Sequence, residues 1–197
     1  MEQQKEIDFY LSVFKDLGIA DADRLIPFVK PRKIDAGEIY IQEGATGKKL
    51  AYISRGLIRT YLLKASGDEI TLMLRWEGQF IASVDSVLFN RASRFFYQAL
   101  EDTEIIEVDY DKIQPVVNNN PLLSLSRNDF LLNMLAEAME RIETFVLLSP
   151  EERYVKLLEE KPDILNRVPG KYLSTMLGIT PVSLSRIRSR IASAGKL

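Results

Sequence analysis

The chain has 197 residues, of which 46% are hydrophobic and 27% charged, so it can bury the core of one large or two small domains. It contains no cysteine and no histidine. This excludes disulfides, the usual zinc, iron–sulfur and haem sites, and Ser-His-Asp or Cys-His catalysis. It also lacks an apolar run of 18 residues and an apolar signal stretch. We therefore expect a cytoplasmic protein that is not bound to a membrane. An enzyme would have to use carboxylates, Lys, Tyr, Ser or a Mg-type site, so most common catalytic routes are removed without catalysis being excluded; we expect no enzymatic activity, no metal and no cofactor.

The net charge of −2 is unevenly distributed. Residues 164–197 hold six basic and no acidic side chains, whereas the rest of the chain holds 20 basic and 28 acidic ones. An acidic body with a basic end is the asymmetry expected when one end meets nucleic acid. A solvated basic tail is the alternative interpretation.

Two helices are predicted at the beginning of the chain. Residues 2–17 carry apolar side chains at helical spacing, and Gly18 is a plausible stop. Residues 21–29 have the pattern of a second, short helix that ends before Pro31. The pattern changes after this point.

Residues 32–109 predict an antiparallel barrel or jelly roll. Short apolar runs alternate there with turn residues, and glycines recur between them. The turn sequence at residues 66–68 predicts a hairpin between strands at 57–63 and 70–74. The other expected strands lie at residues 39–41, 50–53 and 105–108.

A long helix is predicted after Pro121. Residues 122–148 contain no Gly or Pro, and apolar residues repeat along them in alternating steps of three and four. Such a helix is about 40 Å long, which is more than a small domain needs. We favour a dimer seam over a plain core helix, because a second apolar edge remains for the barrel of the same chain. That second edge comprises Leu131, Ala138 and Phe145. The predicted dimer interface comprises Asn128, Leu132, Leu135, Met139, Ile142 and Val146, with Asn128 as a polar residue that sets the register.

The last 50 residues have the spacing of a helix-turn-helix. Residues 149–152 predict a capped helix start, and a short helix at about 170–177 ends in a glycine. Thr180 then caps a second helix with Pro181 at its first position. That second helix exposes small hydroxyls and three arginines, which suit the major groove of DNA. Two packed helices without a DNA role are the alternative. The predicted inner face comprises Leu173, Leu177, Ile179, Leu184, Ile187 and Ile191.

These motifs follow one another in the order of a known family. The barrel glycines, Gly78-Gln-Phe-Ile81, residues 98–104, the long helix and Ile179-Thr-Pro-Val-Ser-Leu-Ser-Arg-Ile187 all match. Over nearly its whole length the chain resembles the cyclic-AMP receptor protein/FNR family of bacterial transcription regulators, and it is most similar to the branch found in Bacteroidetes.

The resemblance implies an α+β fold in three parts. The first is an antiparallel β-roll of the cyclic-nucleotide-binding type with flanking helices, in residues 1–120. A dimerisation helix in residues 121–148 and a helix-turn-helix domain in residues 149–197 follow. Because the given sequence ends at Leu197, soon after the second helix, we expect this domain to lack a complete wing and to lose phosphate contacts.

The resemblance also assigns DNA-contacting positions. Arg186 falls where the family has its base-reading arginine, whereas Pro181 and Val182 occupy the family's other two base-reading positions. We therefore expect a recognised sequence that differs from that of the cyclic-AMP receptor protein. The predicted DNA-contacting residues are Lys171, Tyr172, Thr180, Ser183, Ser185, Arg186, Arg188 and Arg190.

The segment that begins at Gly78 corresponds to the ligand-binding cassette of cyclic-AMP receptors, but its ligand-contacting residues differ from theirs. Their ribose-binding glutamate is replaced here by Ser83, and the positions that reach adenine from the long helix correspond to Ala138 and Met139. The loss of these polar contacts argues against cyclic AMP as the effector. Two alternatives to cyclic AMP remain: the cassette binds a more apolar ligand, or phenylalanine side chains fill it and no ligand binds. Those phenylalanines are Phe80, Phe89, Phe95 and Phe96. The candidate effector-binding residues are Phe80, Ile81, Ala82, Ser83, Ser93, Arg94 and Met139.

The sequence thus predicts a homodimeric, sequence-specific DNA-binding transcription regulator. Its expected partners are double-stranded DNA and a second copy of the chain, with an unidentified small effector and RNA polymerase as further partners. Two alternatives belong to other classes: a small-molecule or protein-interaction module with a decayed DNA-binding end, and a cupin-like enzyme. The lack of histidine disfavours the enzyme.

Overall fold

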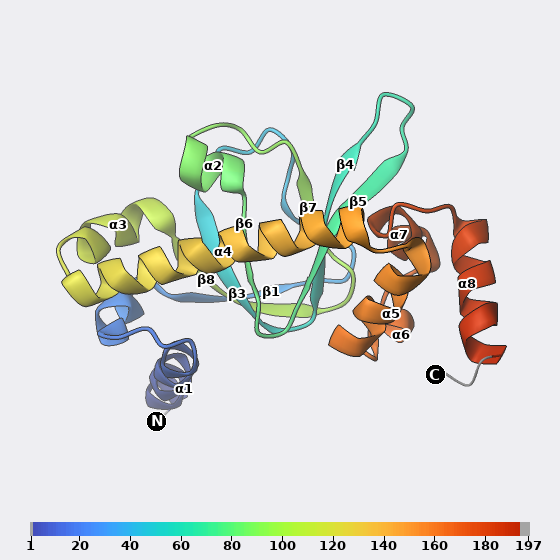
Figure 1. Cartoon of the computed structure of the whole chain (residues 1–197). Coiled ribbons are helices and arrows are strands. Elements are labelled where there is room, and N and C mark those ends of the chain that lie inside the picture. The colour runs from blue at the N-terminus through green and yellow to red at the C-terminus, as the bar shows by residue number, and fades with distance from the viewer. Residues whose placement is uncertain (1, 194–197) are drawn as a thin grey trace.

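The computed structural model describes residues 2–193. A β-roll forms the centre of the molecule, the long helix α4 (Pro121–Leu147) runs along one side of it, and smaller helices gather at both ends (Figure 1). This arrangement confirms the expected α+β class with an antiparallel roll. No helix in this range has the length and hydropathy that crossing a membrane would require.

Two four-stranded antiparallel sheets make up the roll, with strand orders β1-β8-β3-β6 and β2-β7-β4-β5. Alternate side chains from both sheets point inward and fill a common core. The predicted hairpin between β4 and β5 is confirmed: Gly67 adopts a φ of 84°, and its N–H donates to the carbonyl of Lys64 at 2.9 Å. The strands are β1 (Lys30–Ile34), β2 (Ile39–Ile41), β3 (Lys49–Arg55), β4 (Leu57–Leu63), β5 (Glu69–Trp76), β6 (Phe80–Ala82), β7 (Phe96–Ala99) and β8 (Thr103–Asp109).

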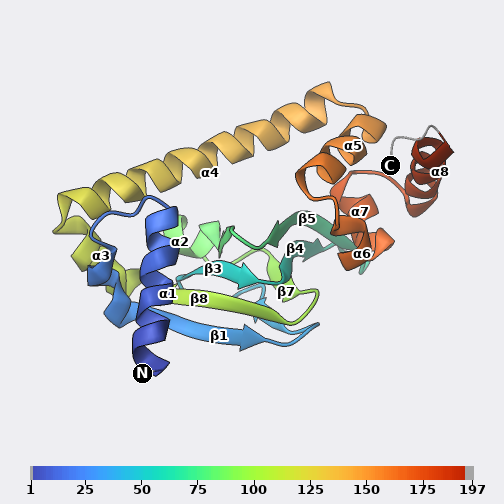
Figure 2. The ribbon, with the colours of Figure 1, turned by 90° about the horizontal axis from the view of Figure 1, so that it is seen from below.

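Three helical segments close one end of the roll, where their apolar faces form a second core with β8 (Figure 2). The expected helix at residues 2–17 is confirmed as α1 (Glu2–Asp16). The expected short helix at residues 21–29 is a 3₁₀-helix, η1 (Ala22–Phe28), which contains Pro27. The third segment is α3 (Tyr110–Asn118).

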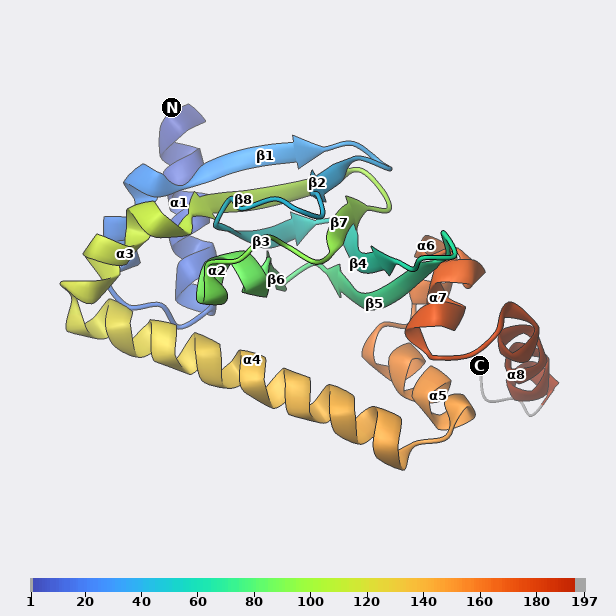
Figure 3. The same ribbon diagram turned by 90° about the horizontal axis from the view of Figure 1, so that it is seen from above.

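The long helix α4 begins where the sequence predicts. Asn120 caps it, because its side-chain oxygen accepts from the N–H groups of Leu122 and Leu123 at 2.9 and 3.1 Å. The helix then passes the roll and leads into the C-terminal helices (Figure 3). It therefore joins the two parts of the molecule.

The C-terminal helices share a core with the roll. The predicted capping box at Ser149 is present, and the buried Tyr154 of α5 packs in one cluster with Leu57 and Leu74 of the roll. The predicted inner face of the last two helices is buried in the same cluster, with Ile179 half-buried. The helices are α5 (Pro150–Glu160), α6 (Ile164–Arg167), α7 (Gly170–Met176) and α8 (Pro181–Ser193). The prediction that this domain lacks a complete wing concerns residues beyond 193, which lie outside the described range.

Candidate nucleic-acid interface and effector cavity

Helix α8 presents one polar face to solvent. Thr180 caps its start, because the Thr180 hydroxyl oxygen accepts from the N–H of Ser183 at 3.1 Å. Leu184, Ile187 and Ile191 are buried, so the residues between them point outward. The outward-facing residues include Val182, Ser185, Arg186, Ser189 and Arg190. Arg186 is exposed and makes no hydrogen bond or ion pair within residues 2–193, so its guanidinium donors are available to a partner.

Not every basic residue of this end is available. Arg190 forms an ion pair with Glu151 of α5 at 3.1 Å. The half-buried Arg188 lies against Gly170 at the start of α7, and its Nε and Nη2 atoms have no partner in the described part of the chain. The charge count therefore overstates the basic surface. Up to residue 193, its exposed members without an ion pair are Lys171 and Arg186.

Tyr172 faces the roll. The Arg59 guanidinium of β4 lies between two aromatic rings, 3.7 Å from the ring centre of Tyr172 and 3.9 Å from that of Tyr61. The Arg59 side chain is 1% exposed, and it forms an ion pair with Glu69 at 2.6 Å. The predicted DNA contact of Tyr172 would require this stack to open. Tyr172 therefore belongs to the junction between α7 and the roll.

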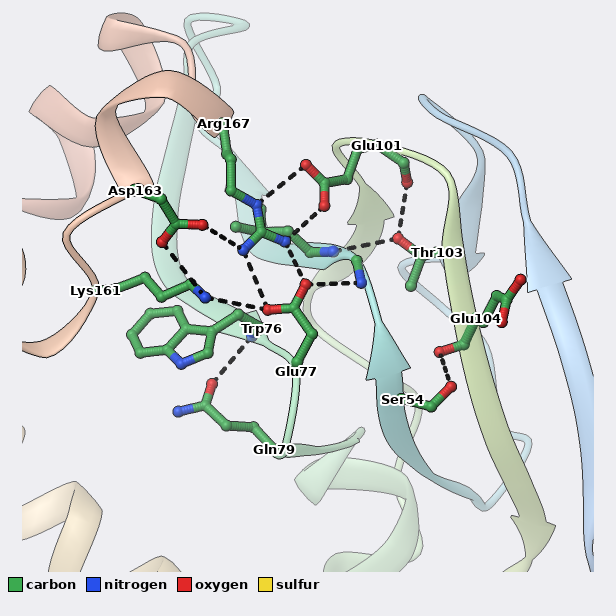
Figure 4. Close-up of polar contacts among 12 residues, drawn as sticks. Ser54, Trp76, Glu77, Gln79, Glu101, Thr103, Glu104, Lys161, Asp163 and Arg167 are labelled. Carbon is green, nitrogen blue, oxygen red and sulfur yellow. Dashed lines mark hydrogen bonds and ion pairs between the residues drawn. The ribbon is translucent and has the colours of Figure 1, made fainter. Parts of the chain in front are cut away.

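A network of ion pairs also joins the roll to the C-terminal helices (Figure 4). Arg167 donates to Glu77 at 2.6 Å and to Glu101 at 2.5 Å, and Lys161 reaches Glu77 at 3.2 Å. Burial alone would raise the pKa of Glu77, but the hydrogen bonds from Arg167, the backbone and Lys161 outweigh it and hold the pKa at about 2. The same contacts with Glu101 and Glu77 raise the pKa of Arg167. Arg167, one of the six basic residues in the range 164–197, therefore binds carboxylates of its own chain.

The predicted dimer stripe of α4 faces away from the roll of its own chain. All six residues of the stripe are exposed, and Val146 has 73% of its surface accessible. Such a row of large apolar side chains is typical of a surface that binds a partner. The exposed apolar members with their exposed fractions are Leu132 63%, Leu135 59%, Met139 48%, Ile142 56% and Val146 73%.

The opposite face of α4 borders a cavity of about 530 Å³ between this helix, the roll, α1 and α3. Leu131 and Ala138, two members of the predicted second edge, line it. The third, Phe145, instead packs against the guanidinium groups of Arg141 and Arg153. Of the candidate effector residues, three line the cavity: Phe80, Ile81 and Ala82.

The other four candidate effector residues lie elsewhere. Ser83 is buried and caps the short helix α2 (Val84–Phe89), and Ser93 bonds within its own loop. Arg94 forms an ion pair with the buried Asp85 at 3.0 Å, and hydrogen bonds from Arg94 are the main reason that the pKa of Asp85 is lowered. Met139 belongs to the exposed stripe.

The idea that phenylalanines fill the cassette is wrong for three of the four. Phe89 is 58% exposed, Phe95 packs against the core of the roll, and Phe96 stacks on Tyr61. Of these four phenylalanines Phe80 alone lines the cavity, so space for a ligand remains. Sequence reasoning also missed Arg75 and Glu137, which line the cavity and form an ion pair at 2.6 Å. The sequence feature that could have identified Arg75 is its charge within an otherwise apolar strand pattern.

Comparison with known proteins agrees with this architecture. Residues 31–120 match the cyclic nucleotide-binding domain family. The chain is similar to the cyclic AMP receptor protein of Thermus thermophilus, with 23% identity over 190 residues that cover 93% of this chain and 86% of that protein. It is also similar to electron transport regulator A of Shewanella oneidensis, with 25% identity over 194 residues that cover 91% and 76%. Among solved structures, FixK2 from Bradyrhizobium japonicum has a TM-score of 0.73 at 15% identity, covering 85% of this chain and 86% of that one.

The roll and the matched segment define a protein with a cyclic nucleotide-binding domain. Along most of its length the chain is similar to these proteins, which agrees with its resemblance to the cyclic-AMP receptor protein/FNR family. The Bacteroidetes branch of that family stays a prediction.

Proposed function

We propose that the chain is a cytoplasmic, homodimeric, sequence-specific DNA-binding transcription regulator. The observation that carries the proposal is the outward face of α8, where Arg186 lies free beside Ser185 on a helix that starts at a capped turn. A guanidinium in this setting can bind guanine bidentately in the major groove. The remaining predicted DNA contacts stay predictions; among them, Tyr172 stacks on Arg59 and Arg190 pairs with Glu151.

The proposed dimer follows from α4. Its exposed apolar stripe has the heptad spacing of a two-stranded seam, and Asn128 is the polar position that would fix the register. A two-fold axis along this seam would place two α8 helices on successive major grooves, about 34 Å apart, on a pseudo-palindrome. The three parts of the chain, residues 1–120, 121–148 and 149–197, then serve as sensor, dimer helix and DNA reader.

The cavity is the proposed effector site, and cyclic AMP is not the proposed effector. Ala82 lines the cavity next to Ser83, so no carboxylate is available there for a ribose hydroxyl. The cassette's Arg94 is already paired with Asp85, an internal carboxylate that takes the place of an external anion. An effector would act by binding more tightly to one arrangement of the dimer than to another. RNA polymerase remains a proposed partner.

Selection of binding sites from a random DNA pool tests this function with the purified protein and no added ligand. We expect a two-fold-symmetric site, and we expect Arg186→Ala to weaken its binding by about 1–3 kcal/mol and to relax one base position. Arg91→Ala, which removes an equal charge from the roll, serves as the control and should leave site preference unchanged. If no sequence is enriched and binding lacks salt dependence, the chain is instead an interaction module with a decayed DNA-binding end.

A further inference from the structure

We propose that the cavity binds an apolar monocarboxylate, with the carboxylate on Arg75 and the apolar body between α4 and the roll. The inference deepens the proposed function, because it names the ligand class of the same effector site. It is carried by the lining of the cavity and by one ion pair that crosses it.

The cavity has the size and walls for an apolar molecule. Its volume of about 530 Å³ lies within the ~300–1,000 Å³ typical of small-ligand sites. Phe14 and Val117 line the end near α1 and α3. In the middle, the ring of Phe80 lies 5.0 Å from that of Phe130 and 5.4 Å from that of Tyr52. Against these rings the polar groups of a base or ribose would be left unpaired, whereas an alkyl or aryl body would pack on them.

Arg75 gives the cavity one anion-binding end. Met73 and Arg75 alternate on β5 and both line the cavity, with Thr60 on the neighbouring strand β4. The Arg75 side chain is only 18% exposed. It donates a hydrogen bond to the Glu137 carboxylate of α4 at 2.6 Å. A guanidinium has five donors in a fork that fits a carboxylate, so Arg75 can hold a ligand carboxylate in the same way.

The second cation of the cavity is less suited to this role. Arg127 donates to the side chain of Asn118 at 2.6 Å, at the corner where α3 meets α4. It is therefore held by a neutral partner outside the roll. Arg75, in contrast, comes from a strand of the roll and faces the interior of the cavity.

Glu137 and a ligand carboxylate would compete for the guanidinium of Arg75. Glu137 is 51% exposed and can move into solvent, so a ligand carboxylate can replace it on Arg75. That exchange would break the ion pair between β5 and α4, the helix that carries the apolar stripe. Ligand binding is thereby linked to the position of α4 relative to the roll.

The test is calorimetric titration of the full chain with decanoate, below its micellar concentration, and with biphenyl-4-carboxylate, which separates alkyl from aryl ligands. We expect one site per chain and at least tenfold weaker binding of decan-1-ol. Arg75→Met should weaken carboxylate binding tenfold or more, whereas Glu137→Gln should strengthen it, because the competing carboxylate is lost. Arg91→Met, which removes an exposed arginine that does not line the cavity, is the matched control and should leave affinity within about twofold.

Glu137→Gln separates the proposal from misfolding, since a gain in affinity requires a folded site. The proposal is overturned if neither carboxylate binds, if decan-1-ol binds as tightly as decanoate, or if Glu137→Gln fails to strengthen binding. The titration uses no DNA, and the selection of DNA sites uses no ligand. Failure of the ligand class therefore leaves DNA recognition intact, and failure of DNA recognition leaves the ligand class intact.

Discussion

Gly56 shows how closely two segments of the roll approach at one residue. Its φ is +103°, and a Cβ at this position would lie 2.7 Å from the Cα of Thr103, an atom of the backbone that cannot rotate away. The Gly56 N–H also donates to Glu77 at 3.0 Å, which ties this turn to the ion-pair network. The residue therefore fixes both the path of the chain from β3 to β4 and the place of Glu77.

We expect Gly56→Ala to destabilise the fold by about 3 kcal/mol or more, because the energetic cost of the strained φ and that of the steric overlap with Thr103 are summed. Urea denaturation followed by circular dichroism measures the loss. Gly47→Ala is the control, since Gly47 has open space around it and should change stability by less than about 1 kcal/mol. A loss as small as that of the control would show that the turn can rearrange.

Local residue roles could be predicted from the sequence, and partners across the chain could not. The caps at Asn120 and Ser149 are set by neighbours two or three residues away, so their sequence signatures are sufficient. The partners of Arg167 lie 66 and 90 residues away in Glu101 and Glu77, and no spacing rule connects them. Arg94 is predicted to contact a ligand, but it pairs with Asp85 only nine residues away; this pair forms through the fold of the loop, which no local spacing rule describes.

At the scale of elements, α4 has two faces with different tasks. The outer face carries the exposed apolar stripe, whereas the inner face lines the cavity. The helix packs mainly against α3 at its beginning, and the cavity separates its middle from the roll. A substitution on the outer face should therefore change association without changing the fold of the chain.

We expect Leu135→Glu to dissociate the proposed dimer, because it places a charge in the centre of the apolar seam. Ala136→Glu is the matched control one residue along, where the same charge lies at the flank of the stripe and not in its centre, and it should weaken association less. Sedimentation velocity measures the mass of each variant, and circular dichroism checks that both remain folded. Equal masses for Leu135→Glu and wild type would place the dimer contact elsewhere or exclude it.

The long periodic elements were predictable, whereas the short strands were predictable only in part: β2 was expected at residues 39–41, but β6 and β7 were not. The α4 helix and the β4–β5 hairpin have patterns that extend over many residues, so their type and limits follow from the sequence. Strands β6 and β7 have only three and four residues, too few for a period to be visible. The cavity also escaped prediction, because it depends on how far α4 stands from the roll.

At the scale of the whole molecule, the DNA-binding end is held against the roll of its own chain. Helix α7 lies along β5, the outer strand of its sheet (Figure 3), and the Thr71 N–H on β5 donates to the Thr175 hydroxyl at 3.1 Å. This contact covers a strand edge that would otherwise be open to pairing. The stack of Arg59 on Tyr172 fixes the same junction. The position of α8 is therefore set by the roll as well as by α4.

The pKa of Glu77 makes this junction sensitive to acid. Because the folded-state pKa of about 2 lies below the ordinary value of 4.5, Glu77 contributes stability that is fully present above pH 4.5 and is lost as the pH falls toward 2. We therefore expect Glu77→Gln to lower the free energy of unfolding more at pH 7 than at pH 3, as measured by urea denaturation at both values. Glu104→Gln, which removes an exposed ion pair with Lys33, is the control and should have a smaller effect at pH 7. If the two Glu77→Gln differences are equal, the charge of Glu77 does not hold the C-terminal helices to the roll.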